Sequence, residues 1–266
     1  MLILVTNDDG VESEGLVKLQ EALSSVGEVL VIAPDRDWTG AGHSKSIHKT
    51  LRVFETHLSD GRPAYATDGT PTDCVALGVL GLVGRHPDVV VSGINKGPNL
   101  GHDITYSGTV AAAMEAVISG IPALAVSLGS YGSWYFDVAA DFASHLLELV
   151  MARAVHHHGV LLNVNVPGLP RPQIKGVEIT RLGQRIYRDV LMCFKDPDGG
   201  ECYRIGGEVP AGIEEEGTDI KALAEGRISI TPIHLDLTHH GLLEQFQKSG
   251  LEEELNRALR DGTDGA

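Results

Sequence analysis

The chain has 266 residues, of which 42% are hydrophobic and 21% are charged, and its formal net charge at pH 7 is −15. This length and balance predict a globular protein with a substantial core and exclude disordered and fibrous classes. The negative charge disfavours a nucleic-acid polymer as partner, and the sparse cysteines and lack of a long apolar run lead us to expect a cytoplasmic protein without membrane contact.

Apolar, β-branched runs alternate with helix-spaced segments over about the first 170 residues. Their continuous apolarity predicts strands buried on both faces of a parallel sheet. The predicted strands are residues 2–6, 28–34, 87–93, 121–128 and 159–167. The predicted helices are residues 14–27, a helix opening at 69–74 with Thr70 as N-cap, a helix from Ser107 to Gly120, and residues 136–155. This alternation predicts a layered α/β/α fold with a mostly parallel sheet.

The character of the chain changes after this region. Residues 185–207 form two short strand patterns around a loop rich in Asp, Pro and Gly, which predicts a β-hairpin. Because its segment VLMCF at 190–194 would expose apolar side chains, we expect an arm that packs on a neighbouring subunit. A hairpin folded back on its own domain is the alternative. A further strand at 228–233 and helices over 241–262 follow.

Two adjacent carboxylates, Asp8 and Asp9, directly follow the first predicted strand. A turn needs at most one Asp before its Gly, so turn chemistry does not explain the second. Polar loops after other strands supply Thr39 and Asn95 at the same edge, where open α/β sheets bind ligands. Paired carboxylates with neutral oxygens suit Mg²⁺, which prefers oxygen ligands. For the DDG stretch alone, a plain polar turn is the favoured interpretation.

The start of the predicted helix at residues 107–109 offers an anion site. Ser107, Gly108 and Thr109 combine free backbone N–H groups, two hydroxyls and a glycine that permits close approach. An ordinary N-cap is the alternative interpretation. Asn99 adds an amide, and His43 on its glycine-rich loop is a candidate proton donor to a phosphate or leaving group, with a surface histidine without a role as the alternative.

Several stretches of the sequence resemble the stationary-phase survival protein SurE family, metal-dependent phosphatases that act on nucleoside monophosphates. The stretches are VTNDDG (5–10), APDR (33–36), GAGHS (40–44), GTPTDCV (69–75), SGINKGPNLGHDITYSGTVAAAMEA (92–116) and GTDIKALAEGRISITPI (217–233). The resemblance spans nearly the whole chain, and the block at 92–116 is long enough to be specific.

This resemblance implies a 5′-nucleotidase with a Rossmann-like core, for which we expect residues 1–184, and a C-terminal extension, residues 185–266, within one structural domain. It implies a homodimer or homotetramer assembled through the arm, and one divalent metal ion per subunit, Mg²⁺ or Mn²⁺. The implied metal ligands are Asp8, Asp9, Thr39 and Asn95, and the implied phosphate-binding residues are Asn99, Ser107, Gly108 and Thr109. Together with the reasoning on His43 above, we predict Asp8, Asp9 and His43 as the catalytic residues. Position 39 departs from the family, which usually has Ser there.

We therefore predict a metal-dependent phosphomonoesterase that hydrolyses nucleoside 5′-monophosphates. A metal-bound water or an aspartate can be the attacking group, and the residues leave this open. The alternative function is a non-enzymatic, receiver-like domain that binds a metal or nucleotide; it would require a phosphoacceptor Asp after a later strand, and SGIN and SLGS have none. A phosphatase of the haloacid dehalogenase type would require D-x-D where this chain has NDDG.

Overall fold

The structure is a computed structural model of the chain, and it describes all residues except 131, 133, 154–158, 208–210 and 262–266. The chain divides into two compact units, Met1–Ile233 and His234–Ala266. The boundary that we expect between core and extension at residue 184 stays a prediction. None of the helices among the described residues is long and apolar enough to cross a membrane.

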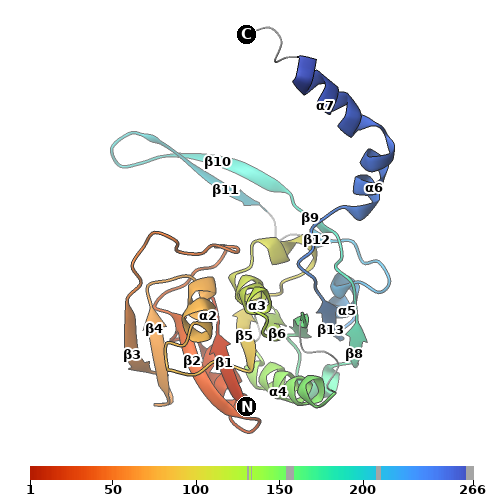
Figure 1. Cartoon of the computed structure of the whole chain (residues 1–266). Helices are drawn as coiled ribbons and strands as arrows, with labels where there is room; N and C mark the ends of the chain where they lie inside the picture. Colours follow the sequence, from red (N-terminus) through yellow and green to blue (C-terminus); the bar gives the residue numbers. More distant parts are fainter. Residues whose placement is uncertain (131, 133, 154–158, 208–210, 262–266) are drawn as a thin grey trace. The chain divides into compact units, whose positions relative to one another are not determined.

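A nine-stranded sheet lies at the centre of the first unit, in the order β3-β4-β2-β1-β5-β6-β7-β13-β8 (Figure 1). Its strands are β1 (Leu2–Thr6), β2 (Glu28–Pro34), β3 (Val53–His57), β4 (Pro63–Thr67), β5 (Val89–Lys96), β6 (Ala123–Gly129), β7 (Leu161–Pro167), β8 (Val177–Ile179) and β13 (Ile228–Pro232). Neighbours from β4 to β7 run parallel, whereas β3 and β13 are antiparallel to β4 and β7. The predicted α/β class with a mostly parallel sheet is confirmed.

Helices cover both faces of this sheet. The first unit contains α1 (Glu14–Leu23), α2 (Pro71–Val79), α3 (Gly108–Ile118), α4 (Phe136–Ala152), α5 (Asp219–Ala224) and the short 3-10 helices η1 (Gly101–Thr105) and η2 (Arg171–Gln173). α1 packs beside α4, and α2 packs beside α3. Thr70 caps α2 as predicted. The helix predicted to end at residue 155 ends at Ala152, and residues 154 and 155 lie outside the described residues.

The order of the strands determines where a ligand site forms. From β1 the chain adds β2 and β4 on one side, then crosses back to place β5, β6 and β7 on the other. Ligands bind in open α/β sheets beyond the carboxyl ends of the strands where this reversal occurs. In this fold the reversal lies between β1 and β5, whose ends carry Asp8, Asp9 and Asn95.

The predicted hairpin is present as β10 (Asp189–Lys195) paired with β11 (Glu201–Gly207), and β9 (Arg185–Ile186) pairs with β12 (Ala211–Gly212) near its base. Figure 1 shows the hairpin extending away from the sheet. All of β10 is exposed, and Ile205 in β11 is 77% exposed. The second unit consists of α6 (His240–Lys248) and α7 (Leu251–Asp261), in agreement with the helices predicted over 241–262, of which residue 262 lies outside the described residues.

Candidate active site

The turn after β1 is built by Asn7 and Gly10. Asn7 is fully buried, and its Nδ2 donates to the Gly10 carbonyl at 3.0 Å and to Ser13 Oγ at 2.6 Å. The Gly10 N–H donates back to Asn7 Oδ1 at 3.2 Å, and the φ of +97° at Gly10 favours glycine. The side chains of Asp8 and Asp9 are therefore not needed to form the turn.

Asp8 lies against the first residues of α3. Its side chain is only 3% exposed, and both the hydroxyl and the backbone N–H of Thr109 donate to its carboxylate. A Cβ on Gly108 would lie 2.7 Å from Asp8 Cβ and 3.0 Å from Asp8 Oδ2, so glycine is required for this approach. These contacts join the predicted metal-binding residues to the predicted anion site.

Two further hydrogen bonds from backbone N–H groups bring Thr39 and Asn95 beside Asp8 and Asp9. The Trp38 N–H donates to the Asp8 carbonyl at 2.8 Å, which places Thr39 beside the turn. The N–H of Lys96 donates to Asp9 Oδ2 at 3.3 Å, which places Asn95 beside Asp9. The four predicted metal ligands therefore come from the turn after β1, the loop after β2 and the carboxyl end of β5.

The two neutral ligand candidates have their donor groups already engaged. Thr39 Oγ1 and the Thr39 backbone N–H both donate to Asp37 Oδ1 at 2.6 Å. Asn95 Nδ2 donates to the Gly97 carbonyl at 2.8 Å. These hydrogen bonds leave the hydroxyl lone pairs of Thr39 and the amide oxygen of Asn95 as the ends available to a cation. Asp37 was not singled out from the sequence, although its position two residues before Thr39 was the available signal.

The electrostatics of the aspartate pair favour a cation. Burial raises the pKa of Asp8, against the opposing effect of the Thr109 hydroxyl. Burial and the neighbouring Asp8 charge raise the pKa of Asp9 to about 6. Neither carboxylate forms an ion pair with a side chain in the described part of the protein. A bound cation would offset this unfavourable charge.

The donor set fits a hard, oxygen-preferring ion. Among the described residues, no three His, Cys, Asp or Glu side chains are grouped so that they could hold a metal ion. A carboxylate pair with neutral oxygens instead suits Mg²⁺ or Mn²⁺, which bind oxygen ligands and accept water in the remaining positions. It does not resemble a zinc site with several His or Cys ligands.

The raised pKa of Asp9 predicts that the metal-free protein becomes less stable as the pH rises. The pKa of Asp9 is about 6 in the folded protein and has its ordinary value of 3.8 in the unfolded chain. Between pH 3.8 and pH 6 the folded state therefore keeps a proton on Asp9 that the unfolded state has lost. The free energy of unfolding should therefore fall as pH rises through this window, by at most ~3 kcal/mol relative to Asp9→Asn. Urea unfolding in EDTA measures this difference, and parallel pH profiles for the two proteins would contradict the prediction.

Ser107 acts as the N-cap of α3, as the alternative interpretation of this residue expected. Its Oγ accepts the Val110 N–H at 3.1 Å. The Thr109 hydroxyl donates to Asp8 Oδ1. A cap does not exclude an anion site, since the N–H groups at the start of a helix and its dipole remain directed outward. The assignment of Ser107, Gly108 and Thr109 to phosphate binding stays a prediction.

Asn99 connects the loop after β5 to the ends of β6 and β7. Its Nδ2 donates to Ser127 Oγ at 2.8 Å, and its backbone N–H donates to Asn165 Oδ1 at 2.8 Å. Its carbonyl accepts from Nδ2 of Asn163 and Asn165 at 2.8 and 3.0 Å. The structure thus shows a buried structural role for Asn99, and its predicted contact with phosphate stays a prediction.

His43 lies beside the middle of α3, where it contacts Glu115. Its Nε2 is 3.2 Å from Glu115 Oε2, and Lys45 Nζ is 2.6 Å from the other carboxylate oxygen. These contacts, that of His43 first, lower the pKa of the buried Glu115 carboxyl. Within the described residues, no hydrogen bond or ion pair joins His43 to Asp8 or Asp9. Glu115 is not predicted as a site residue from the sequence, where its only signal is a lone charge in the apolar run AAAMEA.

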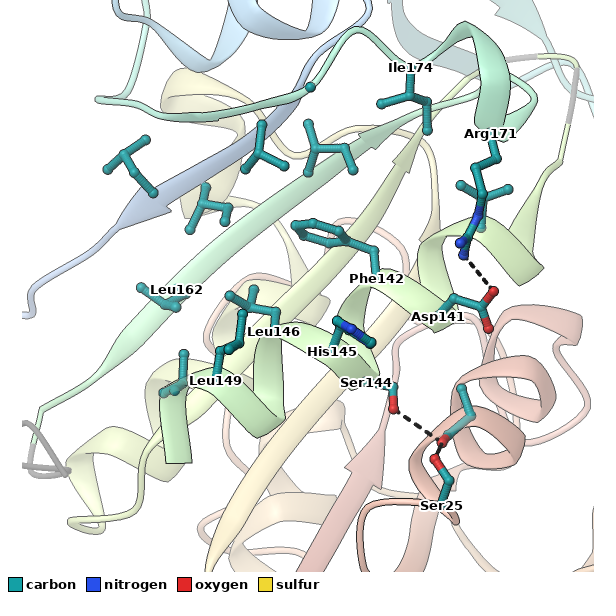
Figure 2. Close-up of a pocket in the computed structure, with 18 of the residues that line it drawn as sticks. Ser25, Asp141, Phe142, Ser144, His145, Leu146, Leu149, Leu162, Arg171 and Ile174 are labelled. Carbon is teal, nitrogen blue, oxygen red and sulfur yellow. Dashed lines mark hydrogen bonds and ion pairs between the residues drawn. The ribbon is translucent and has the colours of Figure 1, made fainter. Parts of the chain in front are cut away.

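A separate groove of about 1080 Å³ lies between α4 and the strands β7, β8 and β13. Figure 2 shows Phe142, Leu146, Leu149 and Leu162 projecting into it from α4 and β7, with the ion pair between Arg171 and Asp141 at its side. None of the predicted site residues lines this groove. It is therefore distinct from the site at the ends of β1 and β5.

Comparisons with a family model, with curated proteins and with solved structures all match this chain to SurE proteins. Residues 3–189 match the family described as "Survival protein SurE". The chain is 50% identical over 250 residues to "5′-nucleotidase SurE" of Chloroflexus aggregans, covering 93% of this chain and 98% of that protein. It is 50% identical over 249 residues to "5′-nucleotidase SurE" of Geobacter sulfurreducens, covering 93% of each. The crystal structure of the SurE protein from Aquifex aeolicus superposes with a TM-score of 0.78 at 40% identity, covering 93% of this chain and 98% of that one.

Proposed function

The chain belongs to the survival protein SurE family, and from that membership we propose that it hydrolyses nucleoside 5′-monophosphates to nucleoside and phosphate. The family resemblance of the sequence is thereby confirmed. The relatives named 5′-nucleotidase SurE support a phosphoric monoester hydrolase. One observation supports it most directly: two adjacent carboxylates that burial disfavours have no ion-pair partner among the described residues, and one of them, Asp8, lies against the first turn of α3.

We propose that Asp8, Asp9, Thr39 and Asn95 hold one Mg²⁺ or Mn²⁺ per subunit. Such an ion, when bound, polarises a phosphoryl oxygen and lowers the pKa of bound water. Asp37 supports this site, because the hydrogen bond that it accepts from Thr39 Oγ1 fixes the direction of the hydroxyl lone pairs. Thr109 supports it in the same way by fixing Asp8.

The first turn of α3 is the proposed phosphate end of the site. The N–H of Gly108 and the Ser107 residue lie where the helix dipole is positive, so negative charge on the equatorial phosphate oxygens is stabilised there. Asn99, on the loop that leads to this turn, is the further proposed phosphate contact. His43 is the proposed proton donor to the leaving oxygen, and its contact with Glu115 holds its ring beside α3.

Phosphate release from nucleoside 5′-monophosphates by the purified full chain tests the proposed function. We expect release in Mg²⁺ or Mn²⁺, its loss in excess EDTA, and its return when the ion is restored, because two uncompensated carboxylates cannot bind an anionic substrate without a cation. The free nucleoside and an enzyme-free sample serve as controls. Undiminished release in EDTA would end the proposal of metal dependence.

We further propose that the protein is a cytoplasmic homodimer or homotetramer, without a nucleic-acid or membrane partner. The exposed apolar side chains of the hairpin support assembly, and the net charge of −15 disfavours nucleic acid. All three cysteines are free, which agrees with a reducing compartment. Static light scattering tests the assembly: a mass of 28.3 kDa, that of one chain, would contradict it.

A further inference from the structure

The 3-10 helix η1 delivers the chain to Ser107, and a carboxylate within it is held by residues far along the sequence. Asp103 Oδ2 lies 2.6 Å from a terminal guanidinium nitrogen of Arg185 and 2.7 Å from its Nε. Tyr187 donates its hydroxyl to Asp103 Oδ1 at 2.6 Å. The Arg185 side chain is only 7% exposed and that of Asp103 is 19% exposed. The ion pair between Asp103 and Arg185 is therefore shielded, whereas Tyr187 is 40% exposed.

The backbone of η1 carries this contact directly to the proposed phosphate end. The Tyr106 N–H donates to the Asp103 carbonyl at 3.0 Å, and the Tyr106 carbonyl accepts the Gly42 N–H at 3.0 Å. Tyr106 immediately precedes Ser107, the N-cap of α3. A shift of Asp103 would therefore move the residue that starts α3.

A second contact fixes the other end of η1. The buried carboxylate of Asp219 accepts the Gly101 N–H at 2.8 Å, the Gly183 N–H at 2.7 Å and the Ile220 N–H at 2.9 Å. Gly101 has a φ of +52°, and a Cβ on it would lie 2.4 Å from the Gly183 carbonyl oxygen. The segment around residues 183–187 thus packs directly on the backbone of η1.

The chemistry of the three side chains makes this arrangement specific. A guanidinium presents a planar fork of donors, so Arg185 fixes the orientation of the Asp103 carboxylate as well as its charge. Partial burial and the Asp103 carboxylate raise the pKa of Tyr187 to about 12, so its phenol remains a donor at neutral pH. Loss of either donor would leave the shielded carboxylate with an unsatisfied oxygen.

We propose that Arg185 and Tyr187 are positioning residues for phosphate-ester hydrolysis. Through Asp103 they fix η1, and through η1 they hold Ser107 and the first turn of α3 against Asp8. The inference rests on the proposed function. According to this inference, the phosphate end of the site is completed by two residues at the base of the hairpin, beyond the expected core of residues 1–184.

Kinetics of Arg185→Met, Arg185→Lys and Tyr187→Phe test this inference in the full chain. We expect kcat/KM to fall by roughly 100-fold in Arg185→Met and less in Tyr187→Phe, as for other small displacements of binding groups. Inhibition by inorganic phosphate should weaken. Arg185→Lys should restore part of the loss. Arg181→Met is the matched control, because Arg181 forms a 2.6 Å ion pair with Glu215 and is 55% exposed.

The results separate the inference from the proposed function. If wild-type protein releases phosphate and a folded Arg185→Met or Tyr187→Phe protein has wild-type kcat/KM, the inference is overturned. If Arg185→Met does not fold, the kinetics of Tyr187→Phe, which keeps the aromatic ring, provide the test. If wild-type protein releases no phosphate, the proposed function fails, and hydrogen exchange decides whether Arg185 and Tyr187 fix η1 and the start of α3: faster exchange at residues 101–109 in Tyr187→Phe supports that placement, and unchanged exchange overturns it.

Discussion

Asp8→Asn is expected to lower kcat/KM for a nucleoside 5′-monophosphate by ~1000-fold or more, because the charge proposed to hold the cation is lost. The amide keeps the shape of the side chain and can still accept the Thr109 hydroxyl, so the turn and the start of α3 should remain in place. Asp9→Asn should act in the same direction. The measurements are phosphate release at several Mg²⁺ concentrations and direct metal binding by calorimetry.

Stability distinguishes this loss from unfolding. Since burial raises the pKa of Asp8, its charge destabilises the metal-free fold at neutral pH, and Asp8→Asn should unfold in EDTA at the same temperature as wild type or at a higher one. Asp60→Asn is the matched control, because Asp60 lies in an exposed turn where it pairs with Arg62 at 3.2 Å. Full activity of Asp8→Asn with wild-type metal affinity would refute the assignment.

The elements that can be predicted from the sequence are those marked by a pattern within their own residues. β1 and β2 are read from continuous apolar runs, and α2 from Thr70 and Pro71 at its start. β3 and β4 were missed, because VFETH and PAYAT have no such run. Their pairing with each other and with β2 makes them strands. Local propensity does not contain that tertiary contact.

The candidate site shows the same difference between residues marked by a local pattern and residues whose role depends on a distant contact. Asp8 and Asp9 can be singled out from the sequence as candidates, because turn chemistry leaves one carboxylate unexplained and polar loops after other strands end at the same edge of the sheet. The buried role of Asn99 cannot be found there, since its amide partner Ser127 lies 28 residues away. Glu115 and Asp103 meet their partners across 72 and 82 residues. A lone acidic residue gives no sign of such a contact until the fold brings its partner to it.

Gly108→Ala is expected to lower kcat/KM by roughly 100-fold, although alanine favours a helix more than glycine does. The added Cβ would lie 2.7 Å from Asp8 Cβ and 3.0 Å from Asp8 Oδ2, so the start of α3 must move away from the carboxylate. That movement weakens the hydrogen bond from Thr109 to Asp8 and displaces the N–H groups proposed to bind phosphate. The proposed metal site and the proposed phosphate end should therefore be damaged together.

Gly241→Ala is the matched control, because Gly241 also lies in the first turn of a helix and its nearest neighbour to a new Cβ is at 3.6 Å. It should leave kcat/KM unchanged, which attributes the loss in Gly108→Ala to the close approach of Asp8 and not to glycine as such. Phosphate-release kinetics and thermal unfolding of both variants provide the comparison. Wild-type kcat/KM in Gly108→Ala would mean that contact between α3 and Asp8 is not required, and the proposed joining of the two half-sites would then be wrong.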